Sequence, residues 1–287
     1  MKIVTDSAAD LTSEDLASFP IAVAPLYIQF PEGEIRSEDL THDEFYNRLE
    51  AMRPQLPTTG QPSPGNFADL YRTIQRGGEE VLSIHISSGL SGTANAARNG
   101  SSQEKEEGIH VVDSLTLSGG LRFQVLAAAQ AIQAGWELPN ILAQLERIRT
   151  ATEVVYTLDT LDYLARGGRI GRVQALASSD LNIKPIISVS KSDGKYNTVG
   201  KSRTISRALN DLTEHLVSLY GMEGPLWVSV MHGRFEEKAR LLAESIQGAL
   251  PVGKLEVLRI SPVLGVHTGP GIVGAAVVPM RLIEEIQ

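Results

Sequence analysis

Hydroxyl side chains gather in four short stretches of this chain, three of which also contain glycine, and each stretch has the composition of a loop that can hold an anion. The stretches are residues 5–11 (TDSAADL), 57–65 (PTTGQPSPG), 87–93 (SSGLSGT) and 265–271 (GVHTGPG). Small side chains let a ligand approach backbone N–H groups, and a helix that begins after such a loop favours negative charge there. The same residue types also cap helices and form turns. The prediction of an anion site therefore depends on the recurrence of such stretches and not on any one of them.

Ser91 and His267 are the residues that could provide nucleophilic chemistry. The stretch GLSGT around Ser91 resembles the G-x-S-x-G turn of serine hydrolases, but it ends in threonine where that motif has glycine. A carboxylate that orients the histidine base, here Asp6 or Asp113, would complete a hydrolytic site. A serine hydrolase acting on an acyl ester through Ser91 and His267 is therefore the alternative function predicted from these residues.

Other common site motifs are incomplete in the sequence. The six histidines show no paired metal-ligand spacing, so we predict no metal site. His85 lies within an apolar run and is predicted to be a hydrogen-bonded core residue. Before Gly200-Lys201-Ser202, Lys195 stands where a phosphate-binding P-loop has its first glycine. We therefore predict no P-loop and no bound cofactor.

Arginines form a separate group in this acidic chain. Arg166, Arg169 and Arg172 recur every three residues around a glycine pair, and Arg203 and Arg207 flank the start of a predicted helix. A guanidinium group makes bidentate contacts with phosphates and carboxylates, which favours recognition of a phosphate or an acidic partner surface. A solvated face with ordinary ion pairs is the other interpretation.

The elements that position these residues alternate between short apolar strands and amphipathic helices, a pattern typical of the α/β class. The predicted strands of the first half span residues 2–4, 21–30, 81–86 and 109–112, and a helix over 118–134 ends near Gly135. These strands predict a mainly parallel sheet flanked by helices. In the second half, a hairpin turn at Ser192-Asp193-Gly194-Lys195 predicts antiparallel pairing and hence a mixed sheet. We predict two α/β domains, 1–150 and 151–287, with the ligand site between them.

Composition limits the partners. The 287 residues carry 26 basic and 34 acidic side chains, a formal net charge of −8, so no basic field attracts nucleic acid. No stretch approaches the roughly 20 apolar residues of a membrane span, and the amino terminus lacks the apolar region of a signal peptide. We expect a cytoplasmic protein without an integral membrane segment. The chain has no cysteine, which excludes thiolate ligands and thiol nucleophiles.

Five motifs together resemble the DegV family of bacterial fatty-acid-binding proteins. The motifs are TDSAADL at 5–11, TGQPSPG at 59–65, SSGLSGT at 87–93, RGGRI at 166–170 and HTGPG at 267–271. The resemblance covers nearly the whole chain. It implies two α/β domains that enclose one long-chain fatty acid, such as palmitate, in a buried tunnel. It also implies a non-catalytic role, in lipid metabolism or transport, in which the acid is presented to a partner fatty acid kinase for acyl-phosphate formation.

The resemblance assigns roles to individual residues. Thr59 and Ser91 match the family hydroxyls that hydrogen-bond the carboxylate, and His267 would lie close to the same head group. Gly92 and Thr268, in the same motifs, complete the predicted fatty-acid site. The predicted kinase-docking residues are Arg169, Arg172 and Arg203. One departure is that Gly60 stands where the family commonly has serine, which puts a supporting hydroxyl in doubt.

Overall fold

The first half of the chain builds a four-stranded parallel sheet from short β-branched runs. The computed structural model describes residues 1–103, 107–173, 183–221 and 223–286. The strands of this half are β1 (Lys2–Asp6), β2 (Ile21–Ala24), β3 (Tyr27–Phe30), β4 (Gly33–Arg36), β5 (Thr58–Gly60), β6 (Val81–His85) and β7 (Ile109–Asp113). The sheet order is β2-β1-β6-β7 with every pairing parallel. The predicted parallel sheet is therefore confirmed.

Helices cover both faces of this sheet. The helices of the first half are η1 (Ser7–Ala9), α1 (Ser13–Ser18), η2 (Ser37–Asp39), α2 (His42–Ala51), α3 (Pro64–Gln75), α4 (Thr93–Ser101), α5 (Ser118–Gln133) and α6 (Leu138–Ala151). Successive residues of a strand face opposite sides. On β1, Val4 packs into a cluster with Phe67 and Tyr71 of α3, whereas Ile3 packs into the cluster that contains Leu121 of α5. The sheet thus has a core on each face.

The second half forms a six-stranded mixed sheet. Its strands are β8 (Glu153–Leu158), β9 (Lys184–Val189), β10 (Tyr196–Ser202), β11 (Leu226–His232), β12 (Val252–Arg259) and β13 (Ile272–Pro279), and its helices are α7 (Asp162–Arg166), η3 (Gly171–Val173), α9 (Ile205–Tyr220), α10 (Glu236–Ala249), α11 (Pro262–Thr268) and α12 (Arg281–Glu284). The order is β10-β9-β8-β13-β11-β12, and of these pairs β11 and β12 are parallel and the others antiparallel. The predicted mixed sheet and the β9–β10 hairpin are confirmed.

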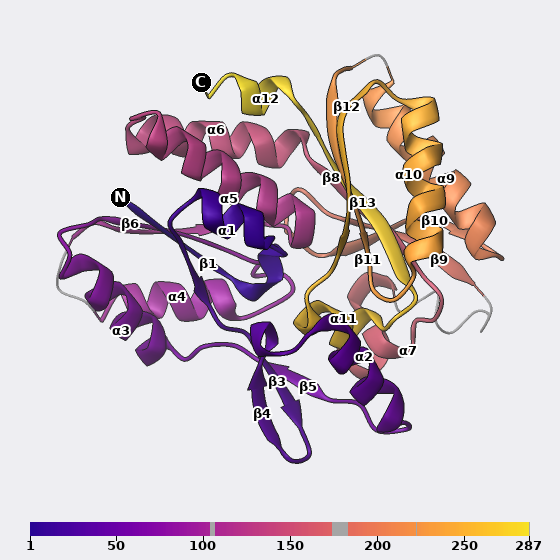
Figure 1. The fold of residues 1–287 in the computed structure, drawn as a ribbon, viewed down its shortest axis with the longest axis horizontal. Coiled ribbons are helices and arrows are strands. Elements are labelled where there is room, and N and C mark those ends of the chain that lie inside the picture. The colour runs from indigo at the N-terminus through magenta and orange to yellow at the C-terminus, as the bar shows by residue number, and fades with distance from the viewer. Residues whose placement is uncertain (104–106, 174–182, 222, 287) are drawn as a thin grey trace.

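Helix α5 lies between the two sheets (Figure 1). It contacts β1 and β6 on one side and β8 and β13 on the other, so nearly all of its residues from Ser118 to Ala131 are buried. Most of these residues are small or apolar, as expected of an enclosed helix. It ends at Gln133, with Ala134 as its C-cap followed by Gly135 at φ +79°, close to the end that the sequence predicted. Helices α9 and α10 cover the outer face of the six-stranded sheet.

One predicted strand is wrong in its extent. The run 21–30 divides into β2 and β3, because Pro25 between them has no N–H with which to continue a ladder. Strand β3 leaves the parallel sheet and pairs antiparallel with β4 and β5. The sequence did not predict this three-stranded sheet, which carries Thr59 on β5.

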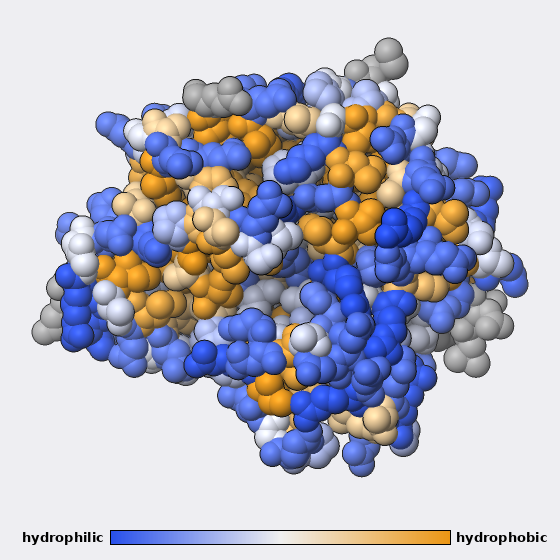
Figure 2. Space-filling model, in the orientation of Figure 1, coloured by the Kyte–Doolittle hydropathy of each residue, from blue (hydrophilic) through white to orange (hydrophobic). Residues whose placement is uncertain are grey.

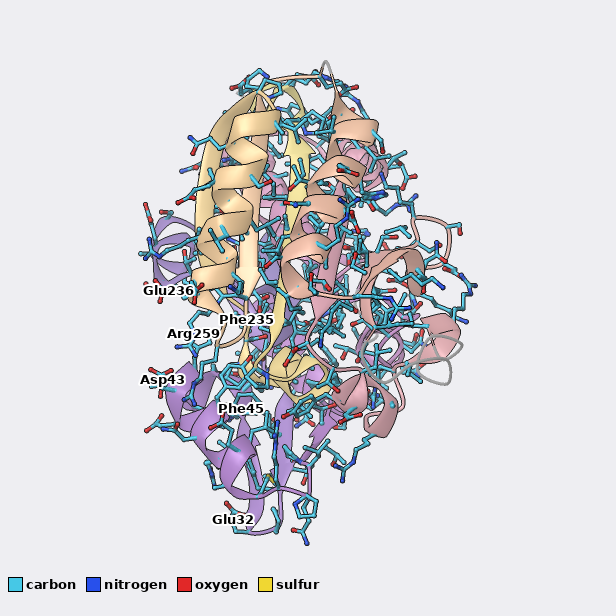
Figure 3. The ribbon with its side chains drawn as sticks, turned by 90° about the vertical axis from the view of Figure 1, so that its right-hand side faces the viewer. Glu32, Asp43, Phe45, Phe235, Glu236 and Arg259 are labelled. Carbon is cyan, nitrogen blue, oxygen red and sulfur yellow. The ribbon has the colours of Figure 1, made fainter. Side chains whose placement is uncertain are left out.

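The two halves share one core and several charged contacts. A continuous buried cluster contains residues of both sheets, and the strands of the first sheets end at Asp113 while those of the six-stranded sheet begin at Glu153. The division at residue 150 stays a prediction. Figure 3 shows Arg259 of β12 facing Asp43 of α2, and their Nη1 and Oδ1 atoms are 2.8 Å apart.

A buried arginine also joins the halves. Arg122 of α5 is 3% exposed and donates to both carboxylate oxygens of Asp15 at 2.7 and 3.0 Å. Its other side donates to Glu256 of β12 and, at 3.4 Å, to Ser229 of β11. The guanidinium thereby neutralises two carboxylates that come from opposite halves of the chain.

The face in Figure 2 has no continuous apolar surface. Hydrophobic residues form separate patches among hydrophilic ones, and the lower part, over α2 and β3 to β5, is mostly hydrophilic. Among the described residues, no helix is both long and apolar enough to cross a bilayer.

Candidate ligand-binding site

Thr59, Ser91 and His267 line one cavity between the two halves. Each comes from a different element: Thr59 from β5, Ser91 from the loop between β6 and α4, and His267 from α11. The space between the lining atoms, its mouth included, is about 530 Å³. We call it the polar cavity. It is lined by Leu26, Thr59, Gly60, Gln61, Ile86, Leu90, Ser91, Leu117, Arg169, Tyr196, Val263, Leu264 and His267.

The polar groups of this cavity have free hydrogen-bonding capacity. The Thr59 hydroxyl and His267 Nε2 are 2.8 Å apart, and the Ser91 hydroxyl lies 2.8 Å from that of Thr93. The other imidazole nitrogen, Nδ1, is buried without a hydrogen-bond partner. It lies so close to Gly167 that a Cβ atom there would be 2.4 Å away. A hydroxyl proton can rotate toward an anion, and the single proton of a neutral imidazole can lie on either ring nitrogen.

The charge of the polar cavity favours an anion. Burial, together with the positive charge of Arg169, lowers the pKa of His267 from 6.5 to about 4. The imidazole is therefore neutral near pH 7, and Arg169 is the cationic side chain among the residues that line the cavity. An anion placed here gains neutral donors and a cation without facing a buried carboxylate.

The lowered pKa of His267 makes stability depend on pH. Between pH 4 and 6.5 the unfolded chain binds more protons at this residue than the folded protein, so its contribution to stability falls as the pH decreases. We expect the free energy of unfolding of the wild type to be lower at pH 5 than at pH 8 by about 2 kcal/mol because of His267, and we expect His267→Gln not to show this part of the decrease. Urea denaturation of both proteins across this range measures the difference.

The comparison with His267→Gln is needed because another group titrates in the same window. Burial raises the pKa of Asp10 to about 6, although Ser118 and Ser261 donate hydrogen bonds to its carboxylate. A raised carboxyl pKa favours the folded state at low pH, which opposes the effect of His267. A pH dependence identical in wild type and variant would contradict the assignment to His267.

The geometry of the hydrolase residues differs from that of a hydrolytic site. Within the described residues, no hydrogen bond joins Ser91 to His267, because their partners are Thr93 and Thr59. Asp6 accepts from His85 Nδ1 at 2.9 Å, and His85 Nε2 is 2.7 Å from the Ser83 hydroxyl. His85 is thus the hydrogen-bonded core residue that the sequence predicted.

The second candidate carboxylate is also engaged elsewhere. One oxygen of Asp113 accepts the backbone N–H groups of Ser88 and Leu115, each at 3.1 Å. It therefore orders the loop after β6 instead of orienting a histidine.

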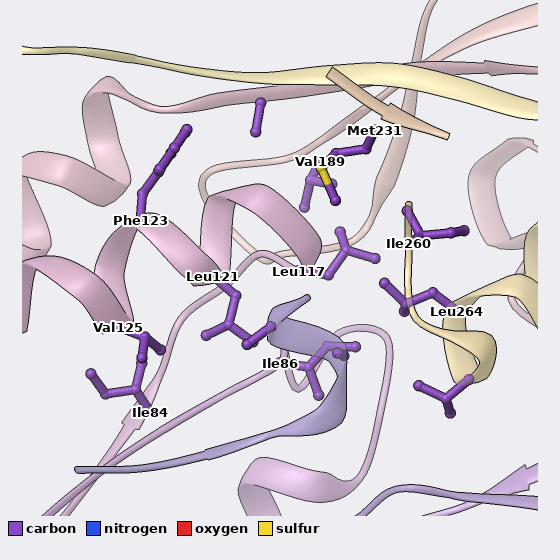
Figure 4. Packing of buried hydrophobic residues seen from close by; sticks show 14 of the residues in the cluster. Ile84, Ile86, Leu117, Leu121, Phe123, Val125, Val189, Met231, Ile260 and Leu264 are labelled. Atoms are coloured by element: carbon purple, nitrogen blue, oxygen red, sulfur yellow. The ribbon is translucent and has the colours of Figure 1, made fainter. Parts of the chain in front are cut away.

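An apolar cavity adjoins the polar one. Leu117, Tyr196 and Leu264 line both, so the two spaces meet at these side chains. The second cavity lies between the start of α5 and the six-stranded sheet, and its space, mouth included, is about 430 Å³. Figure 4 shows Leu117, Met231, Ile260 and Leu264 coming together from separate segments. The lining residues are Leu117, Ser118, Gly119, Val154, Val155, Tyr156, Tyr196, Met231, Ile260, Leu264, Thr268, Ile272, Gly274, Ala275 and Ala276.

The structure separates two of the predicted site residues from the other three. Thr268 lines the apolar cavity, and its hydroxyl donates to the Leu264 carbonyl of its own helix at 3.0 Å. Gly92 lies behind the wall of the polar cavity, where a Cβ atom would come within 2.5 Å of the Gln61 side chain. Gly92 therefore makes room for Gln61.

Gly60 leaves space for the serine that the family commonly has there. A Cβ atom at this position would have its nearest neighbour, Gln29 Nε2, at 3.5 Å, which is ordinary contact. Gly60 lines the polar cavity, so its effect is one hydroxyl fewer in the cavity and not a change of backbone.

The three predicted docking arginines occupy different places. Arg169 lines the polar cavity, and its Nη1 donates to the Gly167 carbonyl at 2.7 Å. Arg172 is exposed and forms an ion pair with Asp193. Arg203 is exposed just before α9, outside both cavities. Arg169 therefore belongs to the candidate binding site as well as to the arginine group.

Sequence reasoning missed Gln61 and Tyr196 as site residues. Gln61 stands in the TGQPSPG motif beside Thr59, so its place in that loop was the available signal. Tyr196 gave no local signal, because it follows an ordinary hairpin turn and reaches the cavity only through the pairing of β10 with β9. A polar cavity that adjoins an apolar one is typical of the class of small-molecule-binding proteins that accommodate an amphipathic ligand.

The chain belongs to the DegV family. The model of this family, described as uncharacterised, matches residues 1–280. A DegV domain-containing protein of Deinococcus radiodurans is 37% identical over 97% of this chain and 98% of its own. The resemblance drawn from the five motifs is thereby confirmed.

Solved structures have the same fold. A DegV family protein of Thermus thermophilus, described by its fatty acid binding, has a TM-score of 0.90 at 31% identity and covers 97% of this chain and 99% of its own. A stearic-acid-binding protein of Eubacterium ventriosum has a TM-score of 0.89 at 28% identity, with 99% of each chain covered.

Proposed function

We propose that this protein binds one long-chain fatty acid, with its carboxylate in the polar cavity and its alkyl chain in the apolar cavity. One observation carries the proposal: the two cavities share Leu117, Tyr196 and Leu264, so a space lined by hydroxyl groups directly adjoins an aliphatic one. The fatty-acid-binding descriptions of the Thermus thermophilus and Eubacterium ventriosum proteins support it.

The head-group chemistry fits a carboxylate that must keep its charge. A carboxylate taken out of water is protonated unless several donors satisfy it. The Thr59 and Ser91 hydroxyls can each donate one hydrogen bond to it, neutral His267 can donate from Nε2 to the Thr59 hydroxyl 2.8 Å away, and Arg169 lies in the same cavity. The predicted role of these side chains is to hold the carboxylate without a lysine clamp.

The tail needs no polar partner. Each buried methylene contributes about 0.8 kcal/mol. Two hydroxyls of the apolar cavity are occupied, whereas the buried Tyr156 hydroxyl has no hydrogen-bond partner. Thr268 donates to Leu264, and the Ser118 hydroxyl donates to Asp10 at 2.6 Å. The remaining lining is mainly aliphatic, which suits a flexible alkyl chain better than an aromatic ring.

Native mass spectrometry of the purified protein, with extraction of its lipids, tests the proposal. We expect one bound acid of roughly 14 to 18 carbons per chain, the range that membership of the family implies, with each buried methylene adding to its affinity. Delipidated protein should take up palmitate at a stoichiometry of one. Recovery and binding of no such acid would refute the proposed function.

A non-catalytic role is part of the proposal. If Ser91 and His267 instead formed a hydrolase, acyl esters would be turned over and Ser91→Ala would abolish that turnover. We expect acid binding without turnover of p-nitrophenyl esters of the same acids. The proposed complex requires no cofactor, and a cytoplasmic location remains a prediction.

We further propose that a fatty acid kinase uses the bound acid and that exposed Arg203 belongs to the docking surface. Because Arg203 lies outside both cavities, Arg203→Ala should leave palmitate affinity within about twofold, the usual range for surface changes. Acyl-phosphate formation by an added kinase subunit should fall at least tenfold through lost charge-assisted contacts. Equal loss of binding and phosphorylation would place Arg203 in the binding site instead.

A further inference from the structure

The turn of the β9–β10 hairpin contacts the loop that carries Ser91. The Ser87 hydroxyl, fully buried, donates a 2.8 Å hydrogen bond to the Gly194 carbonyl of the turn and accepts the Gly89 N–H at 3.1 Å. The Ser87 carbonyl accepts the N–H groups of Leu90 and Ser91, each at 3.0 Å. Ser87 therefore links the head-group loop of the first half to the hairpin of the second.

This contact requires glycine on both sides. A Cβ atom at Gly89 would lie 2.6 Å from the carbonyl oxygen of Asp193, and one at Gly194 would lie 1.9 Å from the Ser87 hydroxyl. Gly194 also has φ +63°, a conformation that other residues rarely adopt. The loop and the turn thus meet backbone against backbone, with no space for a side chain between them.

The same hairpin supplies part of the cavity wall. Tyr196 follows the turn directly, is buried, and lines both cavities. Leu90 and Ser91, on the other side of the contact, line the polar cavity. Separation of the turn from the loop would therefore open the wall where the two cavities meet.

Strand β10 is suited to such a movement. It is the edge of the six-stranded sheet and pairs with β9 alone, and its register is irregular between Thr198 and Gly200. An edge strand loses only one ladder when it moves, and such elements open at low free energy. At the turn, the Ser87 hydrogen bond is accompanied by an ion pair between Asp193 and Arg172.

We propose that Ser87 is a positioning residue that holds the turn of the β9–β10 hairpin closed over the acyl cavities, and that undocking of this turn, with the start of edge strand β10, lets the acyl chain enter and leave. The inference rests on the proposed function. Because Ser87 touches the hairpin and not the ligand, its loss lowers the barrier to both entry and exit. The affinity changes little, because the hairpin turn is closed in the free protein as well as in the complex, and both lose the same hydrogen bond.

Stopped-flow kinetics with a fluorescent polyene fatty acid test the proposal. For Ser87→Ala we expect association and dissociation rates both about three- to tenfold faster, as the loss of one buried hydrogen bond predicts, with the dissociation constant within about twofold. Ser101→Ala is the matched control, because its hydroxyl donates to Arg98 within α4. Asp193→Asn, which weakens the exposed ion pair, should act in the same direction with a smaller effect.

Amide hydrogen exchange gives a readout that does not depend on lipid. In ligand-free Ser87→Ala, amides of residues 190–196 should exchange faster than in wild type, while those of α4 stay unchanged. Rates equal to wild type, or faster dissociation with an equal loss of affinity, would overturn the proposal. If wild type bound no acid, the proposed function would fail, and unchanged exchange at 190–196 would separately refute the Ser87 contact as the hairpin's restraint.

Discussion

Thr59→Val should weaken palmitate binding by about 10- to 100-fold. A hydrogen bond to a charged group contributes about 1.5–3 kcal/mol, and 1.4 kcal/mol corresponds to a tenfold change in affinity. Valine keeps the shape of threonine and removes the hydroxyl, which lies 2.8 Å from His267 Nε2 in the polar cavity. Titration of delipidated protein with palmitate, followed by isothermal calorimetry, measures the change.

Thr268→Val provides a matched control, because it makes the same substitution one residue from His267. The Thr268 hydroxyl donates to the Leu264 carbonyl and faces the apolar cavity, so we expect palmitate affinity to change by less than about threefold. If both variants lost affinity equally, the carboxylate would not be held at Thr59. A loss confined to Thr268→Val would reverse the proposed direction of the acid in the two cavities.

Arg122→Met should be strongly destabilising, by about 3–5 kcal/mol, because it leaves two carboxylates without their cation. Asp15 is 8% exposed and Glu256 is partly buried, so neither regains full hydration in the folded protein. For a chain of this size the melting temperature should fall by roughly 10 °C. Differential scanning calorimetry and urea denaturation at pH 7 measure the change.

Two further variants test whether the unpaired carboxylates cause the loss of stability in Arg122→Met. Arg240→Ala removes an exposed ion pair with Glu236 and should leave the melting temperature unchanged. The triple variant Arg122→Met, Asp15→Asn and Glu256→Gln removes all three charges and should recover part of the lost stability. An Arg122→Met protein as stable as wild type would show that the network joining α1, α5 and β12 contributes nothing to folding.

Much of the fold was predictable because it depends on local patterns. The apolar runs of β1, β6 and β7 and the helices between them are characteristic of a parallel sheet, and Gly194 in its turn marks the β9–β10 hairpin. The division of run 21–30 at Pro25 was also readable in principle, since proline interrupts a ladder. Its consequence was not, because the pairing of β3 with β5 joins residues about thirty positions apart.

The sequence by itself determined the family and the chemical types of the site. The five motifs and their order are sufficient for the family, and the hydroxyl, glycine and histidine residues of those motifs already indicate neutral donors for an anion. These are properties of residue type and local spacing, which can be recognised without knowledge of distant contacts.

Only the tertiary structure decided which of these residues share a cavity. It places Thr59, Ser91 and His267 together, directs Thr268 into the apolar cavity, and brings Arg169 and Tyr196 to the cavity wall. It also shows that Asp6 is hydrogen-bonded to His85 and that Ser87 is hydrogen-bonded to the hairpin turn. The reason is physical: the enclosed space between two sheets and α5 is set by packing among segments more than 100 residues apart, and no local spacing records where their side chains meet.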